Sequence, residues 1–327
     1  MKKRETLKRL ALLPFALQLP AVSFAQKKFP DGPIEMVVPF APGGHSSILA
    51  RLFSSRFTEH LNTPIIILNR PGAGGAVGAE SVVRATPDGK TLIFHASSSS
   101  IYSALSRRPP PYDPVTSFEH VGLVGLAPFV LAVSEKSAFK SLADLVEYAR
   151  KNPGKLSYGS AGLGSSTNVA GERLKIIEGN LDILHVPYGG AGPAIVDTIS
   201  QVVDFTIDNY ISTLNLHNQG RLRILAVFAD QRSEAAPDIP TAKEQGIDMV
   251  GNTFNLVSAP RGTSKEIIDI LAKALHESMQ EESLIKGMKE LGMDPVLDST
   301  PESTAAFITE QAAIVGDVVK KANLYVS

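Results

Sequence analysis

The sequence predicts an α/β protein of about two domains. Short apolar runs rich in β-branched residues alternate with helical patterns over most of the 327 residues. Removal of the first 25 residues, which are typical of a secretory signal, leaves 302 (327 less 25), a length typical of two domains. Alternation of this kind is typical of mostly parallel sheets covered by helices.

The N-terminal segment is interpreted as a signal peptide, residues 1–25. Its first nine residues carry five Lys and Arg side chains, residues 10–25 are mostly apolar, and Ser23-Phe24-Ala25 supplies small residues at a cleavage site. A membrane anchor is disfavoured, because the apolar run is short and contains Pro14 and Pro20. Lys3-Arg4 is similar to a twin-arginine signal with Lys in the first place, so Sec and twin-arginine export both stay open.

Composition excludes several classes of function. The chain has no Cys, so disulfides, Cys-ligated metal and thiol catalysis are absent. Its net charge is −1, with Lys and Arg scattered along the chain, which gives no electrostatic footprint for nucleic acid. We therefore expect an exported, soluble protein that works outside the cytoplasm, without nucleic acid as a partner.

Apolar runs define the strand candidates in chain order. They are 34–40, 64–69, 91–96, 121–126, 129–134, 156–160, 183–188, 203–208 and 222–228. Among the helices between and after them, Ser141-Leu142-Ala143-Asp144 and Thr263-Ser264-Lys265-Glu266 are predicted capping boxes, and Thr300-Pro301 begins a last amphipathic helix.

Neither a repeat nor a low-complexity linker separates the two halves of the chain. The chain is therefore expected to cross between domains more than once, near 129–134 and 222–230. This places 26–128 and 230–327 in the first lobe and 129–229 in the second. A small ligand is expected in the cleft between them.

Three loops follow strand ends and offer backbone N–H groups and hydroxyls with little fixed charge. They are 42–47, 95–100 and 158–168. Open α/β sheets bind ligands at the C-terminal ends of their strands, so three such loops together favour binding over ordinary surface turns.

Other motifs fail the test for catalysis or cofactor binding. The cluster Arg70 to Gly78 imitates a dinucleotide fingerprint, but Asn69-Arg70-Pro71 precede its first glycine and no acidic strand end follows, which favours a packing turn. Gly159-Ser160-Ala161-Gly162 is not a hydrolase elbow, and no histidine spacing supports a metal site. No cofactor is expected.

Two histidines lie near these loops. His185 borders a strand, where a hydrogen-bonded core histidine is the favoured interpretation over a catalytic base. His45 lies in a glycine loop, and both ligand contact and plain solvent exposure stay open for it.

Several motifs in register resemble one family, the periplasmic substrate-binding (Bug) proteins of tripartite tricarboxylate transporters. The resemblance covers essentially the whole chain after the signal, and rests on these stretches: Val38-Pro39-Phe40-Ala41-Pro42-Gly43-Gly44, Asn69 to Gly75, Pro87 to Leu92, Pro111 to Pro114, Tyr158 to Thr167, His185 to Tyr188, Asp208-Asn209 and Pro237 to Thr241.

The resemblance implies a type II periplasmic binding-protein fold, two α/β lobes that close on a small organic carboxylate. It implies no enzymatic activity, a periplasmic location, a membrane permease as partner and a monomer. By position, the implied ligand contacts are Phe40, Ala41, Pro42, Gly43, Gly44, His45, Ser46 and Ser47 on one lobe, Ser160, Ala161, Gly162, Gly164, Ser165, Ser166 and Thr167 on the other, and Ala96, Ser97, Ser98, Tyr188 and Asp208 around them.

Three positions depart from the residues common in that family. Ser47 stands where many relatives have Asp, Asn168 where they have His, and Gly189 where they have Lys. The missing Asp argues against an amino-acid ligand, so a di- or tricarboxylate or an aromatic carboxylate is expected. Two alternatives stay open: a hydrolase with Ser165 or Ser166 as nucleophile, and an adaptor that signals to a sensor kinase.

Overall fold

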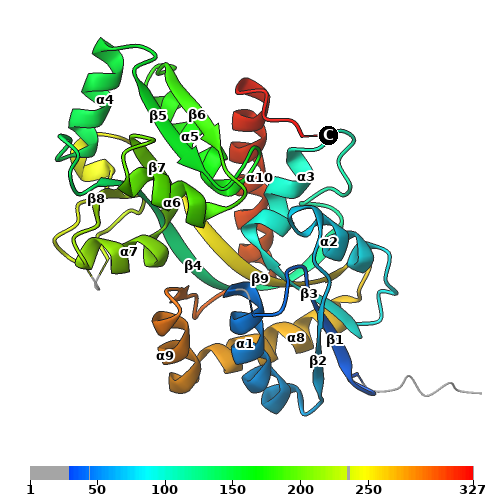
Figure 1. Ribbon diagram of the computed structural model, residues 1–327. Helices are drawn as coiled ribbons and strands as arrows, with labels where there is room; N and C mark the ends of the chain where they lie inside the picture. The colour runs from blue at the N-terminus through cyan, green and yellow to red at the C-terminus, as the bar shows by residue number, and fades with distance from the viewer. Residues whose placement is uncertain (1–28, 44, 234–235, 327) are drawn as a thin grey trace, which may run out of the picture.

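The computed structural model describes residues 29–43, 45–233 and 236–326, which form two α/β lobes (Figure 1). The expected signal peptide, its cleavage after Ala25 and the predicted ligand contact Gly44 lie outside the described residues. Two of the predicted strands, 91–96 and 156–160, have the same bounds in the structure.

The strands join into one sheet of ten strands in the order β2-β1-β3-β9-β4-β7-β5-β6, with β8 and β10 also paired to β4. The strands are β1 (Ile34–Val38), β2 (Ile65–Asn69), β3 (Thr91–Ala96), β4 (Phe118–Ser134), β5 (Leu156–Ser160), β6 (Ile183–Pro187), β7 (Phe205–Asn209), β8 (Leu222–Val227), β9 (Asn252–Pro260) and β10 (Asp294–Pro295).

The prediction of mostly parallel sheets is wrong for the centre of the molecule. β1 pairs parallel with β2 and β3, and β5 pairs parallel with β6 and β7. β9 instead lies antiparallel between β3 and β4, and β7, β8 and β10 all pair antiparallel with β4. β4 is a single strand of 17 residues that contains both candidates 121–126 and 129–134. β4 and β9 run in opposite directions through the centre of the sheet, and every antiparallel pair includes one of these two strands.

The helices cover both lobes. They are α1 (His45–Leu61), η1 (Ala73–Gly75), α2 (Ala76–Val83), η2 (Ser98–Tyr102), α3 (Ser103–Leu105), α4 (Leu142–Lys151), α5 (Ser166–Ile177), α6 (Ala191–Ile199), α7 (Tyr210–Asn218), η3 (Lys243–Gln245), α8 (Lys265–Met279), α9 (Glu282–Glu290) and α10 (Pro301–Lys321).

The predicted helix caps are present with two adjustments. Ser141 accepts a hydrogen bond from Asp144 N, as predicted, but the Asp144 carboxylate accepts from Lys140 N instead of closing a reciprocal box. α8 begins one residue later than expected, with Ser264 as its N-cap. A full capping box occurs at α10, where Thr300 and Ser303 exchange side-chain to backbone bonds.

Each lobe has its own apolar core. In lobe 1, the ring of Phe53 in α1 lies 4.9 Å from that of Phe57 and 5.9 Å from that of Phe94 in β3, measured between ring centroids. In lobe 2, Tyr158 of β5 and Phe205 of β7 stack at 5.5 Å in a core that includes Phe129.

The expected division of the chain between lobes stays a prediction, which we propose to refine. Ile247 and Met249 pack in the lobe 2 core. Gly251 N donates to Phe228 O, and Phe129 N donates to Gly251 O. These bonds hold the segment after β8 against lobe 2, so we propose that the return crossing lies at Gly251–Asn252 and not at 222–230.

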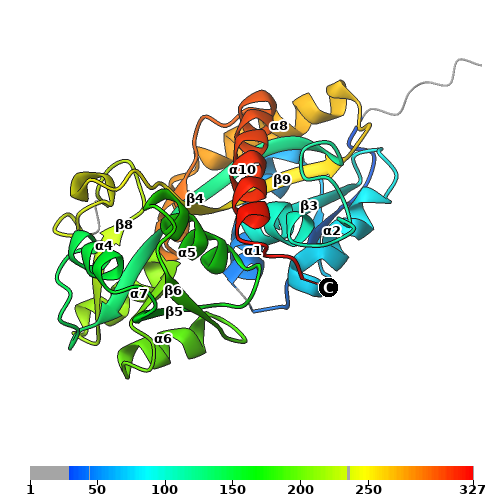
Figure 2. The same cartoon turned by 90° about the horizontal axis from the view of Figure 1, so that it is seen from above.

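The last helix lies between the lobes in both views (Figures 1 and 2). Ile308 and Val315 of α10 pack in one cluster with Leu123 of β4 and Val169 of α5. The segment after α10 contacts lobe 1 as well, because Val326 N donates to Ser106 O, just after α3, at 2.7 Å. α10 thus joins the two lobes at one side of the junction.

Candidate ligand-binding cleft

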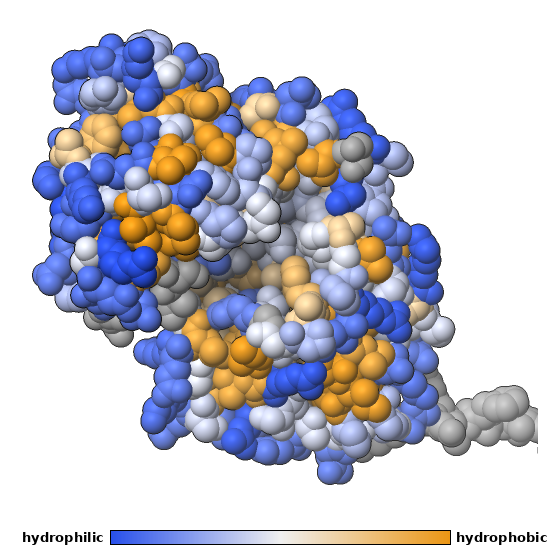
Figure 3. Space-filling model, viewed as in Figure 1, coloured by the Kyte–Doolittle hydropathy of each residue, from blue (hydrophilic) through white to orange (hydrophobic). Residues whose placement is uncertain are grey.

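A cavity of about 250 Å³ lies between the lobes, where the surface is hollowed in the space-filling view (Figure 3). The loop after β1 and the start of α1, the end of β3 and the turn after it, β4, β9 and the segment after α9 supply its lobe 1 side, and α5 and β7 supply its lobe 2 side. The lining residues are Phe40, His45, Ser46, Ala96, Ser97, Ser98, Ala127, Ser166, Asn209, Thr253, Asn255, Leu291, Gly292 and Met293.

Helix N-termini from both lobes meet at this cavity. His45 and Ser46 are the first two residues of α1, Ser98 begins η2 and Ser166 begins α5, while Asn209 is the N-cap of α7. The first N–H groups of a helix have no partner within the helix, and they carry the positive end of its dipole. The cavity wall therefore presents partial positive charge and hydrogen-bond donors, which suit an anion.

Two hydroxyl groups and one side-chain amide at the cavity are held in place by hydrogen bonds. Ser97 Oγ and Thr253 Oγ1 lie 2.9 Å apart and bridge the β3 and β9 sides of the wall. Asn255 Nδ2 donates to His95 O at 2.9 Å, which fixes the amide of Asn255 beside the Ser97 loop. Groups held in this way lose little further freedom when a ligand binds.

The cavity carries no full charge of its own among its described lining residues, none of which is Lys, Arg, Asp or Glu. His45 is the one ionisable side chain in that set. It stays exposed at the rim, and desolvation by the surrounding protein lowers its pKa, so its imidazole is neutral at pH 7. Recognition of an anion here thus rests on neutral donors and helix dipoles.

The structure brings seven of the predicted contacts to the cavity wall: Phe40, His45, Ser46, Ala96, Ser97, Ser98 and Ser166. The remaining described ones are not in the wall. Ala41, Pro42 and Gly43 are exposed beside it, and Ala161, Gly162, Gly164 and Ser165 form the loop that leads into α5.

Ser47 and Thr167 have structural roles instead of facing the cavity. Ser47 is fully buried, and its Oγ accepts from Asn69 Nδ2 at 3.0 Å while the same amide donates to Phe40 O. Thr167 Oγ1 accepts from Ala161 N at 2.9 Å. Each hydroxyl hydrogen-bonds to a group that holds the loop before its helix: Asn69, which also bonds to Phe40 O, and Ala161 N. Both side chains therefore position the backbone of these loops beside the cavity.

Tyr188 and Asp208 also lie outside the wall. Tyr188 points to α6, where its hydroxyl donates to Asp197 at 2.7 Å. Asp208 is 2% exposed beside the lining residue Asn209, and its Oδ1 accepts from Asn209 N. Oδ2 has no partner among the described residues, and desolvation raises the pKa of this carboxyl to about 6.

One cluster in lobe 2 imitates a catalytic triad. Ser160 Oγ and His185 Nε2 lie 2.6 Å apart, and His185 Nδ1 lies 3.3 Å from Asn168 Nδ2. Ser160 is fully buried, however, and its Oγ also accepts from Gly162 N, so no substrate reaches it. His185 is the hydrogen-bonded structural histidine that the sequence favours.

The glycine cluster Arg70 to Gly78 is a packing turn, as predicted. A Cβ at Gly78 would lie 2.7 Å from Pro39 Cβ, and one at Gly75 would lie 2.5 Å from Ser99 Cβ. The φ of Gly75 is +97°, which also favours glycine. The cluster presses α2 against the two loops that form the cavity.

Sequence reasoning missed half of the wall: Ala127, Asn209, Thr253, Asn255, Leu291, Gly292 and Met293. Thr253 and Asn255 belong to β9, whose polar residues alternate with Phe254 and Leu256; that alternation is the signal for the strand. Leu291–Met293 follow α9, and only the pairing of β10 with β4 brings them to the cavity.

The described part of the chain shows neither a metal-binding cluster nor a membrane-spanning helix. No group of three or more His, Asp or Glu side chains there is placed to hold a metal ion. Within those residues, no helix combines the length and apolar character needed to cross a membrane.

The chain belongs to the receptor family of the tripartite tricarboxylate transporters, whose model matches residues 49–324. It is therefore a solute-binding protein of the periplasmic class and not an enzyme, which confirms the family resemblance, the fold and the expected lack of catalysis.

Individual proteins resemble the chain over most of its length. Protein BugT of Bordetella pertussis is 32% identical over 90% of each chain. The structure of the periplasmic binding protein BugD is 31% identical with a TM-score of 0.73, and covers 91% of this chain and 99% of its own. An R. palustris protein with adipate is 32% identical with a TM-score of 0.76, over 91% of this chain and 99% of its own.

Proposed function

We propose that this protein captures a small organic carboxylate between its lobes and delivers it to a tripartite tricarboxylate-type permease. Di- and tricarboxylates and aromatic carboxylates are the ligand classes proposed. The observation that carries the proposal is the meeting of four helix N-termini, from both lobes, at one cavity without a charged side chain in its described wall.

The same carboxylate is proposed to contact both lobes. Ser46, Ser97 and Ser98 offer hydroxyls from lobe 1, and Ser166 and Asn209 offer donors from lobe 2. A ligand that bonds to both sides favours the closed arrangement over an open one, because it binds the closed form more tightly. Of the other predicted contacts, Ser47, Thr167, Asp208 and the exposed and loop residues are proposed to act by shaping these loops.

The proposed ligand is a carboxylate, and the proposed place of action is the periplasm. A bound adipate in a protein 32% identical to this chain supports a carboxylate ligand. We propose that the chain is exported, cleaved after Ala25 and active as a monomer in the periplasm, where the closed form is recognised by the permease.

A thermal-shift panel tests the proposal. Organic acids are compared with their uncharged amides, for example benzoate with benzamide, on the mature protein. A bound acid at 100 times its dissociation constant adds about 2.7 kcal/mol to the free energy of unfolding, whereas the amide adds little. Equal shifts with acid and amide, or no shift with any acid, would refute carboxylate capture.

A further inference from the structure

The cavity has two chemically different walls. The donor wall consists of His45, Ser46, Ser97, Ser98, Ser166 and Asn209, which lie at helix N-termini, with Thr253 and Asn255 of β9, which are hydrogen-bonded to Ser97 and His95. Phe40 and Ala96 complete the lobe 1 side, and Thr253 lies opposite Ala127 in the sheet. The α9 wall consists of Ala127, Leu291, Gly292 and Met293. β10 pairs with β4 in the register Asp294 to Leu126, which carries Met293 alongside Ala127 and makes the α9 wall continuous.

The α9 wall offers no hydrogen-bond donor from its loop. The side chains of Leu291 and Met293 are apolar, and the three backbone N–H groups are already used. Leu291 N donates to Gly287 O, Gly292 N to Lys289 O and Met293 N to Met288 O, at 3.0 to 3.1 Å. A carboxylate placed against this loop would lose its water and gain no donor in return, which is costly.

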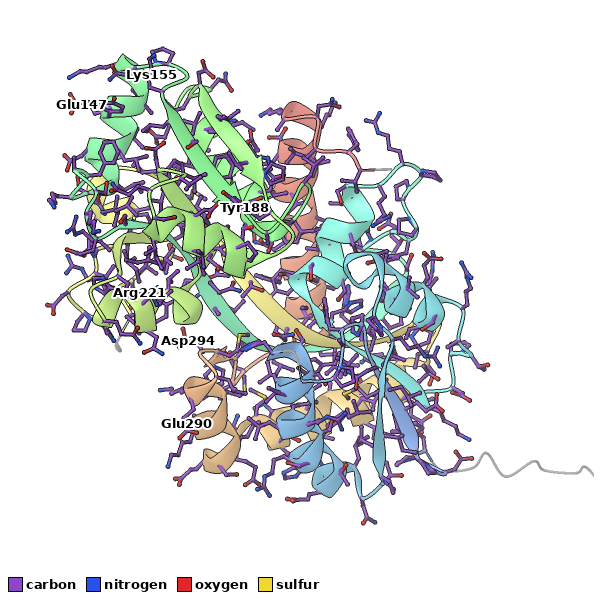
Figure 4. The ribbon with its side chains drawn as sticks, in the orientation of Figure 1. Glu147, Lys155, Tyr188, Arg221, Glu290 and Asp294 are labelled. Carbon is purple, nitrogen blue, oxygen red and sulfur yellow. The ribbon has the colours of Figure 1, made fainter. Side chains whose placement is uncertain are left out.

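The electrostatic potential at the α9 wall also disfavours a carboxylate there. Leu291 is the C-cap of α9, so the negative end of that helix dipole lies at the cavity. Asp294 follows directly, on the edge of the lower lobe that faces α7 (Figure 4). Lys289, the basic residue of the last turn, lines a separate groove with Ile285 and Lys286 and is not in the cavity wall.

We infer that this cavity selects a monocarboxylate with an apolar body: the acid group meets the donor wall and the apolar end meets the α9 wall. The inference rests on the proposed function, in which both lobes hold a single carboxylate. Of the ligand classes proposed above it keeps aromatic monocarboxylates and excludes di- and tricarboxylates, because residues 291–293 reject a second carboxylate at the far end of the molecule. A cavity of about 250 Å³ is smaller than the roughly 300–1,000 Å³ pockets that take drug-sized ligands, which suits a small acid.

Three acids of equal chain length test the inference by calorimetry on the mature protein at pH 7.5. Hexanoate, adipate and 6-aminohexanoate share one carboxylate and differ at the other end, which is methyl, carboxylate or ammonium. We expect hexanoate to bind at least tenfold more tightly than adipate, with 6-aminohexanoate between them, because its ammonium loses water at the α9 wall but meets the negative end of the α9 dipole. Benzoate and terephthalate repeat the comparison with a rigid body, and benzoate is expected to bind more tightly.

A charge added to the α9 wall should reverse the preference. Leu291→Lys supplies a cation and donors there, so adipate is expected to gain at least tenfold in affinity while hexanoate loses affinity. Leu297→Lys, a matched change at a side chain 38% exposed and outside the wall, should leave both affinities unchanged. Thermal unfolding of each variant checks that it is folded, and the unmodified protein decides the question if Leu291→Lys does not fold.

The outcomes separate the two proposals. Adipate binding as tightly as hexanoate, together with terephthalate matching benzoate, overturns the apolar far end and leaves carboxylate capture intact. Tighter binding of 6-aminohexanoate than of hexanoate overturns the apolar far end as well. Absence of binding by all five acids overturns both. Tighter binding of the monoacids, reversed by Leu291→Lys alone, supports the inference.

Discussion

At the scale of single residues, Asn168 ties the loop before α5 to the core of lobe 2. It is fully buried; its Oδ1 accepts from Gly164 N at 2.9 Å, and its Nδ2 donates to the Tyr158 hydroxyl at 2.8 Å. Asn168→Leu leaves both of these groups without that partner, at a cost of about 1–3 kcal/mol each. We expect a lower free energy of unfolding by about 3 kcal/mol in urea, with weaker ligand binding.

The matched control is Asn215→Leu, at an exposed position of α7. Surface substitutions of this kind change stability by less than about 0.5 kcal/mol. Equal stability of Asn168→Leu and Asn215→Leu would contradict a positioning role for Asn168.

Two buried histidines in lobe 1 predict a loss of stability in acid. Desolvation lowers the pKa of His95 to about 3, with a further contribution from the charge of His120, and desolvation lowers the pKa of His120 to about 4. Below about pH 6.5 the unfolded chain protonates both rings and the folded protein does not, so stability falls from about pH 6.5 down to about 4. Asp208 acts in the opposite sense, because its raised pKa lets the folded protein bind a proton first.

Urea unfolding at pH 7.5, 6 and 5 measures this dependence. We expect a decrease across the series that is smaller in the double variant His95→Gln, His120→Gln. The exposed His276→Gln should retain the full decrease. An unchanged slope in the double variant would show that other groups cause the acid sensitivity.

At the scale of elements, the N-terminal cap of α10 should contribute to stability because that helix packs on both lobes. Thr300 Oγ1 accepts from Ser303 N at 3.0 Å, and Ser303 Oγ accepts from Thr300 N at 2.9 Å. Thr300→Ala removes one half of this box and is expected to cost about 1 kcal/mol in urea unfolding. Thr309→Ala, which removes an exposed hydroxyl from the interior of the same helix, should change stability by less than about 0.5 kcal/mol; a comparable loss there would count against the cap.

Elements defined by local pattern could be predicted from the sequence, and elements defined by distant partners could not. β3 (TLIFHA) is mostly apolar and β5 (LSYGS) alternates apolar with small polar residues, and the bounds of both were predicted. β9 was missed because Asn252, Thr253, Asn255 and Ser258 break its apolar character, and its stability comes from pairing with β3 and β4, more than 100 residues earlier. The joining of 121–126 and 129–134 into β4 depends on the same pairing.

At the scale of the whole molecule, the cavity wall also has parts that a local sequence pattern predicts and parts that depend on distant strand pairing. Ser97, Ser98 and Ser166 were predicted because each lies in a loop that directly follows a strand and opens a helix. The α9 wall depends on how residues 291–293 return to β4, which no local signal reveals. Ser47 shows what position in the sequence alone does not reveal: it lies at the start of α1, and helix geometry turns its side chain inward to Asn69.

The most direct test of carboxylate capture is a crystal structure with the tightest-binding acid of the panel. The account predicts the carboxylate between the lobes, within hydrogen-bond distance of donors at the N-termini of α1, η2 and α5. An acid with no carboxylate within hydrogen-bond distance of these donors, or an acid bound outside the cleft, would contradict it.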